Sequence, residues 1–128
     1  MVAGSLDTEE FVLKRISMVA AVLAAAAVAA SGASAATPVL KGSVTNAFKI
    51  YLKQGSKTVT SLKAGTYKIV VSDPTSAHNF HLSGPGVNKS TSVSGTGTTT
   101  WTVKLKKGTY KYVCDPHSSF MKGSFTVK

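Results

Sequence analysis

Residues 99–114 read TTWTVKLKKGTYKYVC, and the alternation of apolar and polar residues in this stretch recurs through most of the chain. Trp101, Val103 and Leu105 alternate with Thr and Lys, and a Lys-Gly pair then separates this run from a second one. Successive side chains of a β-strand point to opposite faces, so a period of two produces one apolar and one solvated face. The stretch therefore predicts two half-buried strands joined by a turn.

Similar short segments follow one another along the chain. Strands are predicted near 39 to 45, 48 to 53, 57 to 62, 66 to 72, 78 to 83, 99 to 106, 108 to 114 and 120 to 127. No stretch after residue 36 has a helical period, and many short strands with regular turns predict an all-β antiparallel sandwich or barrel. Residues 88–100, NKSTSVSGTGTTT, are predicted to form a flexible loop with at most a short edge strand.

The N-terminal segment differs from the rest. Residues 16–30, ISMVAAVLAAAAVAA, form an apolar run directly after Lys14 and Arg15. The run is shorter than the roughly 20 residues that cross a bilayer, and it suits a signal-peptide core with a cleavage site at 33–35. We therefore predict a cleaved export signal, an N-terminal signal helix, over 1–35 and one domain over 36–128. An uncleaved anchor or a buried Ala-rich helix is the alternative interpretation.

The predicted domain is strongly basic. Residues 36–128 contain 13 Lys, no Arg and the two acids Asp73 and Asp115, which gives a formal charge of +11. Such a surface attracts anionic partners. The lysines are interleaved with apolar positions, whereas nucleic-acid binding needs a compact basic patch or a recognisable module. We therefore expect no nucleic-acid partner, and an acidic protein or an anionic envelope surface fits better.

Residues that can bind a metal ion are few in this domain and lie close together. The segment YKYVCDPHSSFMKG at 110–123 places Cys114, His117 and Met121 within eight residues. A buried Cys or Met is ordinarily a plain core residue, but an unpaired Cys in an exported protein calls for an explanation. Thiolate, imidazole and thioether suit copper better than calcium or magnesium, and two imidazoles, one thiolate and a weak axial Met form the blue-copper set.

The second imidazole comes from the segment SAHNFHL at 76–82. Strand parity places His78 on one face with Phe80 and Leu82, the predicted core face, and His81 on the opposite face with Asn79. An inward-facing imidazole at the start of a strand can meet a loop from the far end of the sequence. We therefore predict His78 as the ligand and His81 as a solvated surface histidine.

These segments resemble the cupredoxins, most closely the amicyanin and plastocyanin group. The residues that carry the resemblance are His78, Asn79, Tyr110, Tyr112, Cys114, Pro116, His117 and Met121. The resemblance implies an eight-stranded Greek-key sandwich that holds one copper ion and transfers single electrons. Three residues separate His117 from Met121, one more than in amicyanin and one fewer than in plastocyanin, which leaves the strength of the axial bond open.

The same resemblance implies supporting roles around the ion. Asn79, Asp115 and Pro116 would fix the ligand geometry from outside the metal shell. The ring of His117, with Pro116 and Phe120, would form the surface through which the electron leaves. The predicted function is that of an exported, monomeric electron carrier in the periplasm, cell envelope or extracellular space, with a redox partner whose docking surface is acidic.

Two other functions are considered for these residues. A copper-handling protein that stores or delivers the ion is the alternative, because the surface is basic and His81 is unassigned. A copper enzyme needs a second copper centre, commonly with a His adjacent to the ligand cysteine. Val113 precedes Cys114 and only His81 is left over, so we predict that the protein is not an enzyme.

Overall fold

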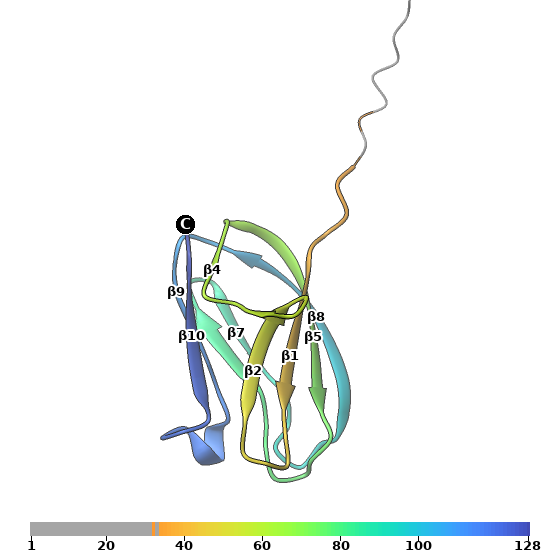
Figure 1. Cartoon of the computed structure of the whole chain (residues 1–128), viewed down its shortest axis with the longest axis vertical. Coiled ribbons are helices and arrows are strands. Elements are labelled where there is room, and N and C mark those ends of the chain that lie inside the picture. The colour runs from red at the N-terminus through yellow and green to blue at the C-terminus, as the bar shows by residue number, and fades with distance from the viewer. Residues whose placement is uncertain (1–31, 33) are drawn as a thin grey trace, which may run out of the picture. The chain divides into compact units, whose positions relative to one another are not determined.

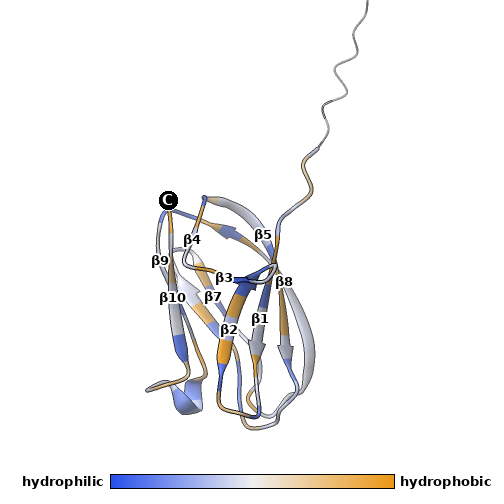
Figure 2. Cartoon of the chain, viewed as in Figure 1, coloured by the Kyte–Doolittle hydropathy of each residue, from blue (hydrophilic) through white to orange (hydrophobic). Residues whose placement is uncertain are grey.

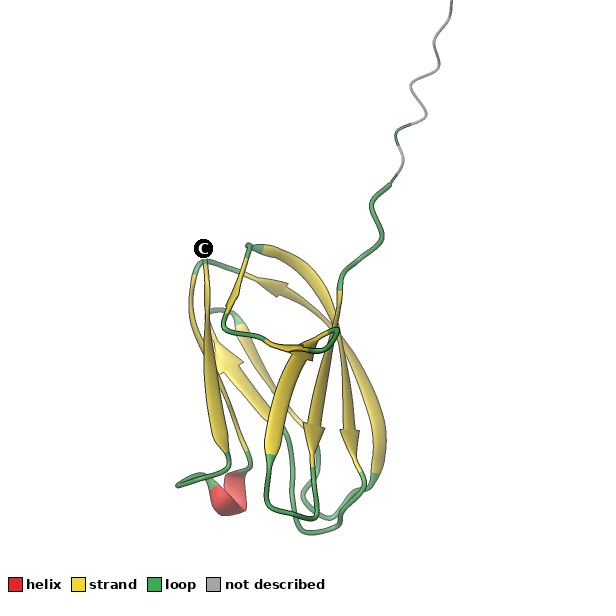
Figure 3. Ribbon diagram, viewed as in Figure 1, coloured by secondary structure: helices red, strands yellow, loops and turns green. Residues whose placement is uncertain are grey.

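The computed structural model describes residue 32 and residues 34–128, so the predicted signal helix and nearly all of the segment 1–35 lie outside the described residues. The chain from Ala35 to Lys128 forms one compact unit. In this unit nearly all regular structure is strand, and Figure 3 shows a single short helical turn at one end. None of the helices in the described part is long and apolar enough to span a bilayer.

The unit consists of two five-stranded sheets. The first has the order β3 (Lys57–Thr58), β2 (Ile50–Gln54), β1 (Val39–Val44), β5 (Gly65–Asp73) and β8 (Gly97–Leu105). The second has the order β4 (Ser61–Leu62), β10 (Lys122–Val127), β9 (Gly108–Val113), β6 (His81–Gly84) and β7 (Val87–Ser90). Neighbouring strands are antiparallel except for β1 with β5 and β4 with β10, which are parallel. The predicted all-β sandwich is confirmed.

The core lies between the two sheets and follows the predicted alternation. Along β5 the buried apolar residues are Tyr67, Ile69 and Val71, and along β9 they are Tyr110 and Tyr112. Figure 2 shows apolar positions recurring along the strands between polar ones. A fully buried aliphatic side chain contributes about 1.5–3 kcal/mol through the hydrophobic effect. These inward faces therefore supply most of the free energy that fixes how the two sheets pack.

The prediction of one continuous strand over 57–62 was wrong. Residues 57–58 pair in the first sheet as β3, and residues 61–62 pair in the second sheet as β4. Between them the Val59 amide donates to the Leu52 carbonyl at 2.9 Å, and the Thr60 carbonyl accepts from Thr126 at 3.1 Å. The chain therefore crosses from one sheet to the other here, and a short apolar alternation cannot reveal which sheet each residue joins.

Three predicted strands begin later than expected: β10 begins at Lys122 rather than at 120, and β2 and β6 leave loops before them. β2 begins at Ile50 because residues 45–49 form a turn, in which Phe48 has a φ of 57° and Thr45 donates to the Lys49 carbonyl at 2.9 Å. β6 begins at His81, so residues 78–80 precede the strand. Both segments thus become loops at an end of the sandwich, where side chains are free to converge.

The Ser/Thr-rich segment 88–100 is more ordered than predicted. β7 occupies its first residues, β8 begins at Gly97, and only residues 91–96 connect them. β8 pairs with β5 over its whole length, from Gly97 opposite Asp73 to Leu105 opposite Gly65. Pairing along an entire strand satisfies the backbone groups on the side of β8 that faces β5, even though few of its side chains are apolar.

One end of the sandwich carries the loops that matter for function. The 3-10 helix η1 (Asp115–His117), the turn at 45–49 and the loop at 74–80 lie at the lower end in Figure 1, whereas the C-terminus lies at the upper end. The first two of these loops come from different sheets. Residues far apart in the sequence are therefore brought together at this end.

Tyr110 closes the other end of the core, and its hydroxyl group should matter for stability. The hydroxyl donates to the Pro85 carbonyl at 2.7 Å and accepts from the Lys106 amide at 2.9 Å, while the residue is fully buried. We expect Tyr110→Phe to lower the free energy of unfolding by about 2 kcal/mol, because two buried backbone groups lose their partner. Urea denaturation checks this. Tyr51→Phe, at a half-buried position on β2, is the control and should cost less than half as much.

Candidate metal centre

Three donor atoms from two loops meet at the lower end of the sandwich. The Nδ1 atoms of His78 and His117 are 3.1 Å apart, and the Cys114 Sγ atom lies 3.7 Å from the first and 3.6 Å from the second. No other group of three metal-binding side chains of the His, Cys, Asp or Glu type occurs among the described residues. The structure therefore brings together the three predicted ligands.

The spacing of these atoms suits one small metal ion. A metal of this size forms bonds of about 2.0 Å to imidazole nitrogen and about 2.3 Å to thiolate. Three such bonds in one plane would separate nitrogen from nitrogen by about 3.5 Å, and sulfur from nitrogen by about 3.7 Å. The two sulfur–nitrogen distances match these values, and the nitrogen–nitrogen distance is slightly shorter. Two imidazoles and one thiolate in a trigonal set are the donors that copper prefers.

The β9–β10 connection positions Cys114 and Met121 as neighbours. Cys114 follows β9 directly and Met121 precedes β10, and the Cys114 amide donates to the Met121 carbonyl at 3.0 Å. The His117 carbonyl accepts from the Met121 amide at 2.8 Å, and the His117 amide donates to the Cys114 carbonyl at 3.0 Å. The backbone is thus closed around a tight loop. Met121 is 1% exposed, so its side chain is buried, and its backbone is bonded to both Cys114 and His117.

His78 is buried as predicted, but for a different reason. It is 2% exposed, and the side chains of Asn79 and Phe80 are equally buried. Strand parity placed Asn79 with His81 on the face opposite His78, which is wrong because residues 78–80 do not form a strand. The loop directs all three side chains inwards. His81, the first residue of β6, is partly exposed.

Asn79 and Asp115 join the two loops by paired hydrogen bonds. The Asp115 amide donates to the Asn79 Oδ1 atom at 2.7 Å, and the Asn79 Nδ2 atom donates to the Asp115 carboxylate at 2.7 Å. Asn79 also donates to the Thr91 carbonyl at 3.3 Å. These contacts tie the residue after His78 to the residue after Cys114. Pro116 is exposed beside them, at the start of η1.

His81 has partners that the sequence did not predict. Its Nδ1 atom lies 2.9 Å from the Asp115 carboxylate, and its Nε2 atom lies 2.6 Å from the Asn88 side-chain oxygen. Only a doubly protonated imidazole can donate to both oxygens. The hydrogen bond to Asp115, together with that to Asn88, therefore raises the pKa of His81 above its usual 6.5. His81 is the more exposed of the two histidines, as predicted. Its hydrogen-bond partners were not predicted, because no local pattern in the sequence indicates that β6, β7 and the Cys114 loop meet here.

The partners of Asp115 lower the pKa of its carboxyl group. Partial burial by itself would raise that pKa, but the hydrogen bonds from Asn79 and His81 outweigh it and hold the pKa below 3.8. Asp115 is thus an anion that receives hydrogen bonds from both sides. Its charge favours the protonated form of His81 and the observed position of Asn79.

Phe48 is a residue at the site that sequence analysis missed. Its ring contacts the edges of His78 and His117, with centroid distances of 4.9 and 5.1 Å. Phe48 and Phe120 are 51% and 59% exposed, and their centroids are 6.2 Å apart. The strand predicted near 48 to 53 included Phe48 as its first residue. A positive φ turns it outwards over the two histidines, and no local pattern signals that turn.

The comparisons with known proteins agree with this geometry. The sequence profile described as "Copper binding proteins, plastocyanin/azurin family" matches residues 45–128. A comparison with curated proteins finds no match.

Solved structures of rusticyanin are similar in fold. One, of reduced rusticyanin at 1.9 Å, is 21% identical, with a TM-score of 0.53 over 74% of this chain and 81% of that chain. Another, at 2.1 Å, is 20% identical, with a TM-score of 0.55 over 74% and 80%. At this identity the likeness shows the fold alone. The finer resemblance to amicyanin stays a prediction from the sequence motifs.

The ion pair of His81 and Asp115 should make stability depend on pH. The raised pKa of His81 means that its contribution is complete below pH 6.5 and is lost as the pH rises through the folded value. The lowered pKa of Asp115 means that its contribution is present above pH 3.8 and is lost as the pH falls through the folded value. We therefore expect His81→Gln to be most destabilising between these two limits.

The effect should be small, because the two side chains are 28% and 49% exposed. We expect about 0.5 kcal/mol at pH 5 and clearly less at pH 9, as for other solvated pairs. Urea denaturation of the copper-free protein and its variant at both pH values measures it. If His81→Gln lowered the free energy of unfolding equally at pH 5 and pH 9, the ion pair between His81 and Asp115 would not be the cause.

Proposed function

Because the chain belongs to the plastocyanin/azurin family of copper-binding proteins, and is therefore a cupredoxin, we propose that it carries single electrons between redox partners outside the cytoplasm. Its cofactor is one type 1 copper ion. The observation that carries the proposal is the convergence of Cys114 Sγ with the Nδ1 atoms of His78 and His117, all within 3.7 Å of one another.

His78, Cys114 and His117 would hold the ion, and Met121 would be a weaker ligand. Copper would supply a one-electron couple between Cu(I) and Cu(II), and the donor set suits both states. Met121 is buried and bonded through its backbone to the other two residues of its loop, which supports its assignment. Its thioether would tune the reduction potential rather than hold the ion alone.

The surroundings of the ligands would keep them in place when the oxidation state changes. Cys114 is fully buried, and the hydrogen bonds of Asn79 and Asp115 hold its loop against the loop of His78. A site whose ligands hardly move needs little reorganisation for each electron. The same burial argues against storage or delivery of copper, because an exchangeable site needs ligands that another protein can reach.

The electron would leave through the exposed end of the site. His117 is partly exposed, and Pro116 and Phe120, which are close to it in the chain, are exposed. Phe48 joins them, since its ring contacts His117. This apolar surface, formed by Phe48, Pro116, His117 and Phe120, would let a partner approach the imidazole edge without displacing charged groups.

Catalysis is not part of the proposal. Cupredoxins are electron carriers rather than enzymes, and a copper enzyme would require further ligands. In the described part of the chain His81 is the one imidazole left over, and it is engaged by Asp115 and Asn88. A second copper centre would therefore lack ligands.

We also propose that the protein is exported and that its partner is acidic. Residues 1–35 would be a cleaved signal peptide and residues 36–128 the copper domain, which would work as a monomer in the periplasm, the envelope or outside the cell. The +11 charge of residues 36–128 favours a redox partner with an acidic docking surface, and would also permit contact with an anionic envelope.

Adding Cu(II) to the protein should produce an intense visible band from the thiolate–copper bond. We expect Cys114→Ser to abolish the band, because no thiolate remains. His78→Ala should also abolish it, whereas His81→Ala should leave its intensity within about twofold, since His81 lies outside the donor set. Absorption spectroscopy measures all four proteins. Loss of the band in His81→Ala but not in His78→Ala would show that the ligand assignment is wrong.

A positive charge on the apolar surface should slow electron exchange between two copies of the protein. We expect Phe120→Lys to lower the self-exchange rate by about tenfold or more, because like charges would face each other on contact. Val39→Lys is the matched control: Val39 is also an exposed apolar residue, but it begins β1 at the other end of the sandwich. NMR line broadening at fixed ionic strength measures the rates. Equal slowing in both variants would contradict an exit at Phe120.

A further inference from the structure

A buried carboxylate lies outside the copper site with one oxygen unpaired. Asp73 ends β5 and is 3% exposed. Its Oδ1 atom accepts from the Thr75 amide at 3.1 Å and from the Thr75 hydroxyl at 3.3 Å. Its Oδ2 atom has no hydrogen-bond partner among the described residues. The Oδ1 atom thus stabilises the turn after β5 through its bonds to Thr75, whereas the Oδ2 atom forms no hydrogen bond with the described residues.

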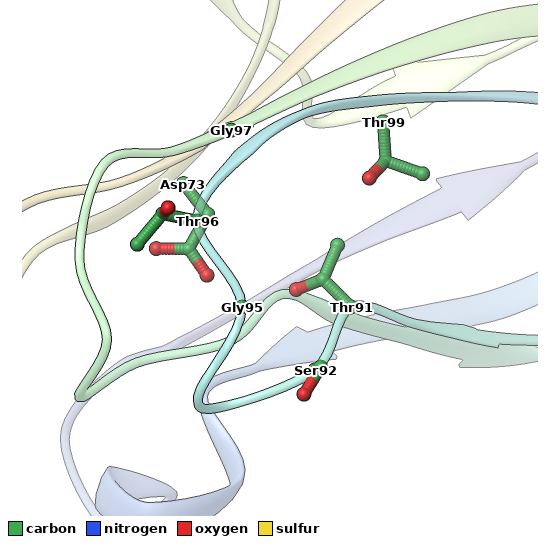
Figure 4. Close-up of a pocket in the computed structure, with 7 residues that line it drawn as sticks. All are labelled: Asp73, Thr91, Ser92, Gly95, Thr96, Gly97 and Thr99. Carbon is green, nitrogen blue, oxygen red and sulfur yellow. The ribbon is translucent and has the colours of Figure 1, made fainter.

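The unpaired carboxylate borders a pocket of about 140 Å³. Figure 4 shows Asp73 beside Thr96 and facing the loop that precedes β8. The other lining residues are Thr91, Ser92, Gly95, Thr96, Gly97 and Thr99. Most of these residues are exposed, so the pocket is open to solvent, whereas the Oδ2 atom of Asp73 at its wall is itself buried. Side chains on this lining bear oxygen as their only polar atoms: carboxylate and hydroxyl groups, with backbone carbonyls nearby.

The charge of Asp73 lacks compensation from within the protein. An ionised carboxylate removed from water is costly unless it is paired. No Lys, Arg or His in the described residues forms a salt bridge with Asp73, although the domain is rich in Lys. A cation from solution would supply both the missing charge and a partner for Oδ2.

We propose that this pocket binds a hard cation, and that Ca²⁺ is the ion that fits it. Carboxylate, hydroxyl and carbonyl oxygens are its preferred ligands, whereas copper requires the nitrogen and sulfur atoms of the other site. Ca²⁺ accepts irregular coordination completed by water, which a loop such as 91–96 offers, while Mg²⁺ demands a near-ideal octahedron. Since only one carboxylate contributes, the dissociation constant should be on the order of 10⁻⁴ to 10⁻³ M.

Thr91 lines the pocket and also contacts the loop that carries His78, but the pocket and the copper centre have no ligand in common. The Thr91 hydroxyl accepts from the Phe80 amide at 2.9 Å, and the Thr91 carbonyl accepts from Asn79 at 3.3 Å. The calcium site would therefore form with or without copper. This proposal does not rest on the electron-carrier function.

Calorimetric titration of the full chain with CaCl₂, in copper-free and in copper-loaded form, tests the proposal. We expect one site with a similar affinity in both forms. Asp73→Asn should weaken binding by at least about tenfold, because it removes the charge while Oδ1 still accepts from Thr75. Circular dichroism of the variant establishes that it is folded.

A second pair of variants tests the lining without touching the carboxylate. Thr99 lies opposite the buried Val71 and lines the pocket, whereas Thr100 lies opposite Val70 on the other face of the sheet. Thr99→Val should weaken Ca²⁺ binding and Thr100→Val should not. Absence of calcium binding, equal binding by folded Asp73→Asn, or a preference for Na⁺ over Ca²⁺ at matched ionic strength would each overturn the proposal.

Discussion

The paired hydrogen bonds between Asn79 and Asp115 are the constraint on which the site depends. They join a loop between β5 and β6 to the loop between β9 and β10, 36 positions later in the chain. Without this link each loop would carry its donors independently, and the entropy of holding three donor atoms together would oppose metal binding. With it, the sandwich presents a site that is assembled by the fold, because the pair fixes the residues next to two of the ligands.

Besides the bonds between Asn79 and Asp115, the β9–β10 hairpin positions the metal centre. The bond between the Cys114 amide and the Met121 carbonyl continues the β9–β10 ladder by one residue pair, which places sulfur from each strand end on the inside. The strands β9 and β10 fix both ends of the loop between them, and the hydrogen bonds of Asp115 to Asn79 and His81 fix the loop against its neighbours. A carrier of single electrons benefits from such rigidity, since ligand movement would add to the barrier for each transfer.

The two acidic residues of the domain, Asp73 and Asp115, differ in burial and in hydrogen bonding. Asp115 is half exposed yet has partners on both carboxylate oxygens, and its anionic form is stabilised. Asp73 is almost wholly buried and leaves one oxygen without a partner. Both lie near the loop end, on a chain that is otherwise strongly basic. The carboxylate of Asp115 is thus satisfied within the protein, whereas that of Asp73 is only half satisfied.

The sequence alone determined the fold class and the chemistry of the site. Alternating apolar residues predicted the sandwich, and the short spacing of Cys114, His117 and Met121 predicted copper, because local spacing limits what one loop can present. Only the tertiary structure decided the positions of Phe48, His81 and Asp73 and the crossing at 57–62. Their surroundings come from segments distant in the chain, and His78 itself meets His117 across 39 positions. Local periodicity carries no information about contacts made over such separations, which the packing of the two sheets fixes.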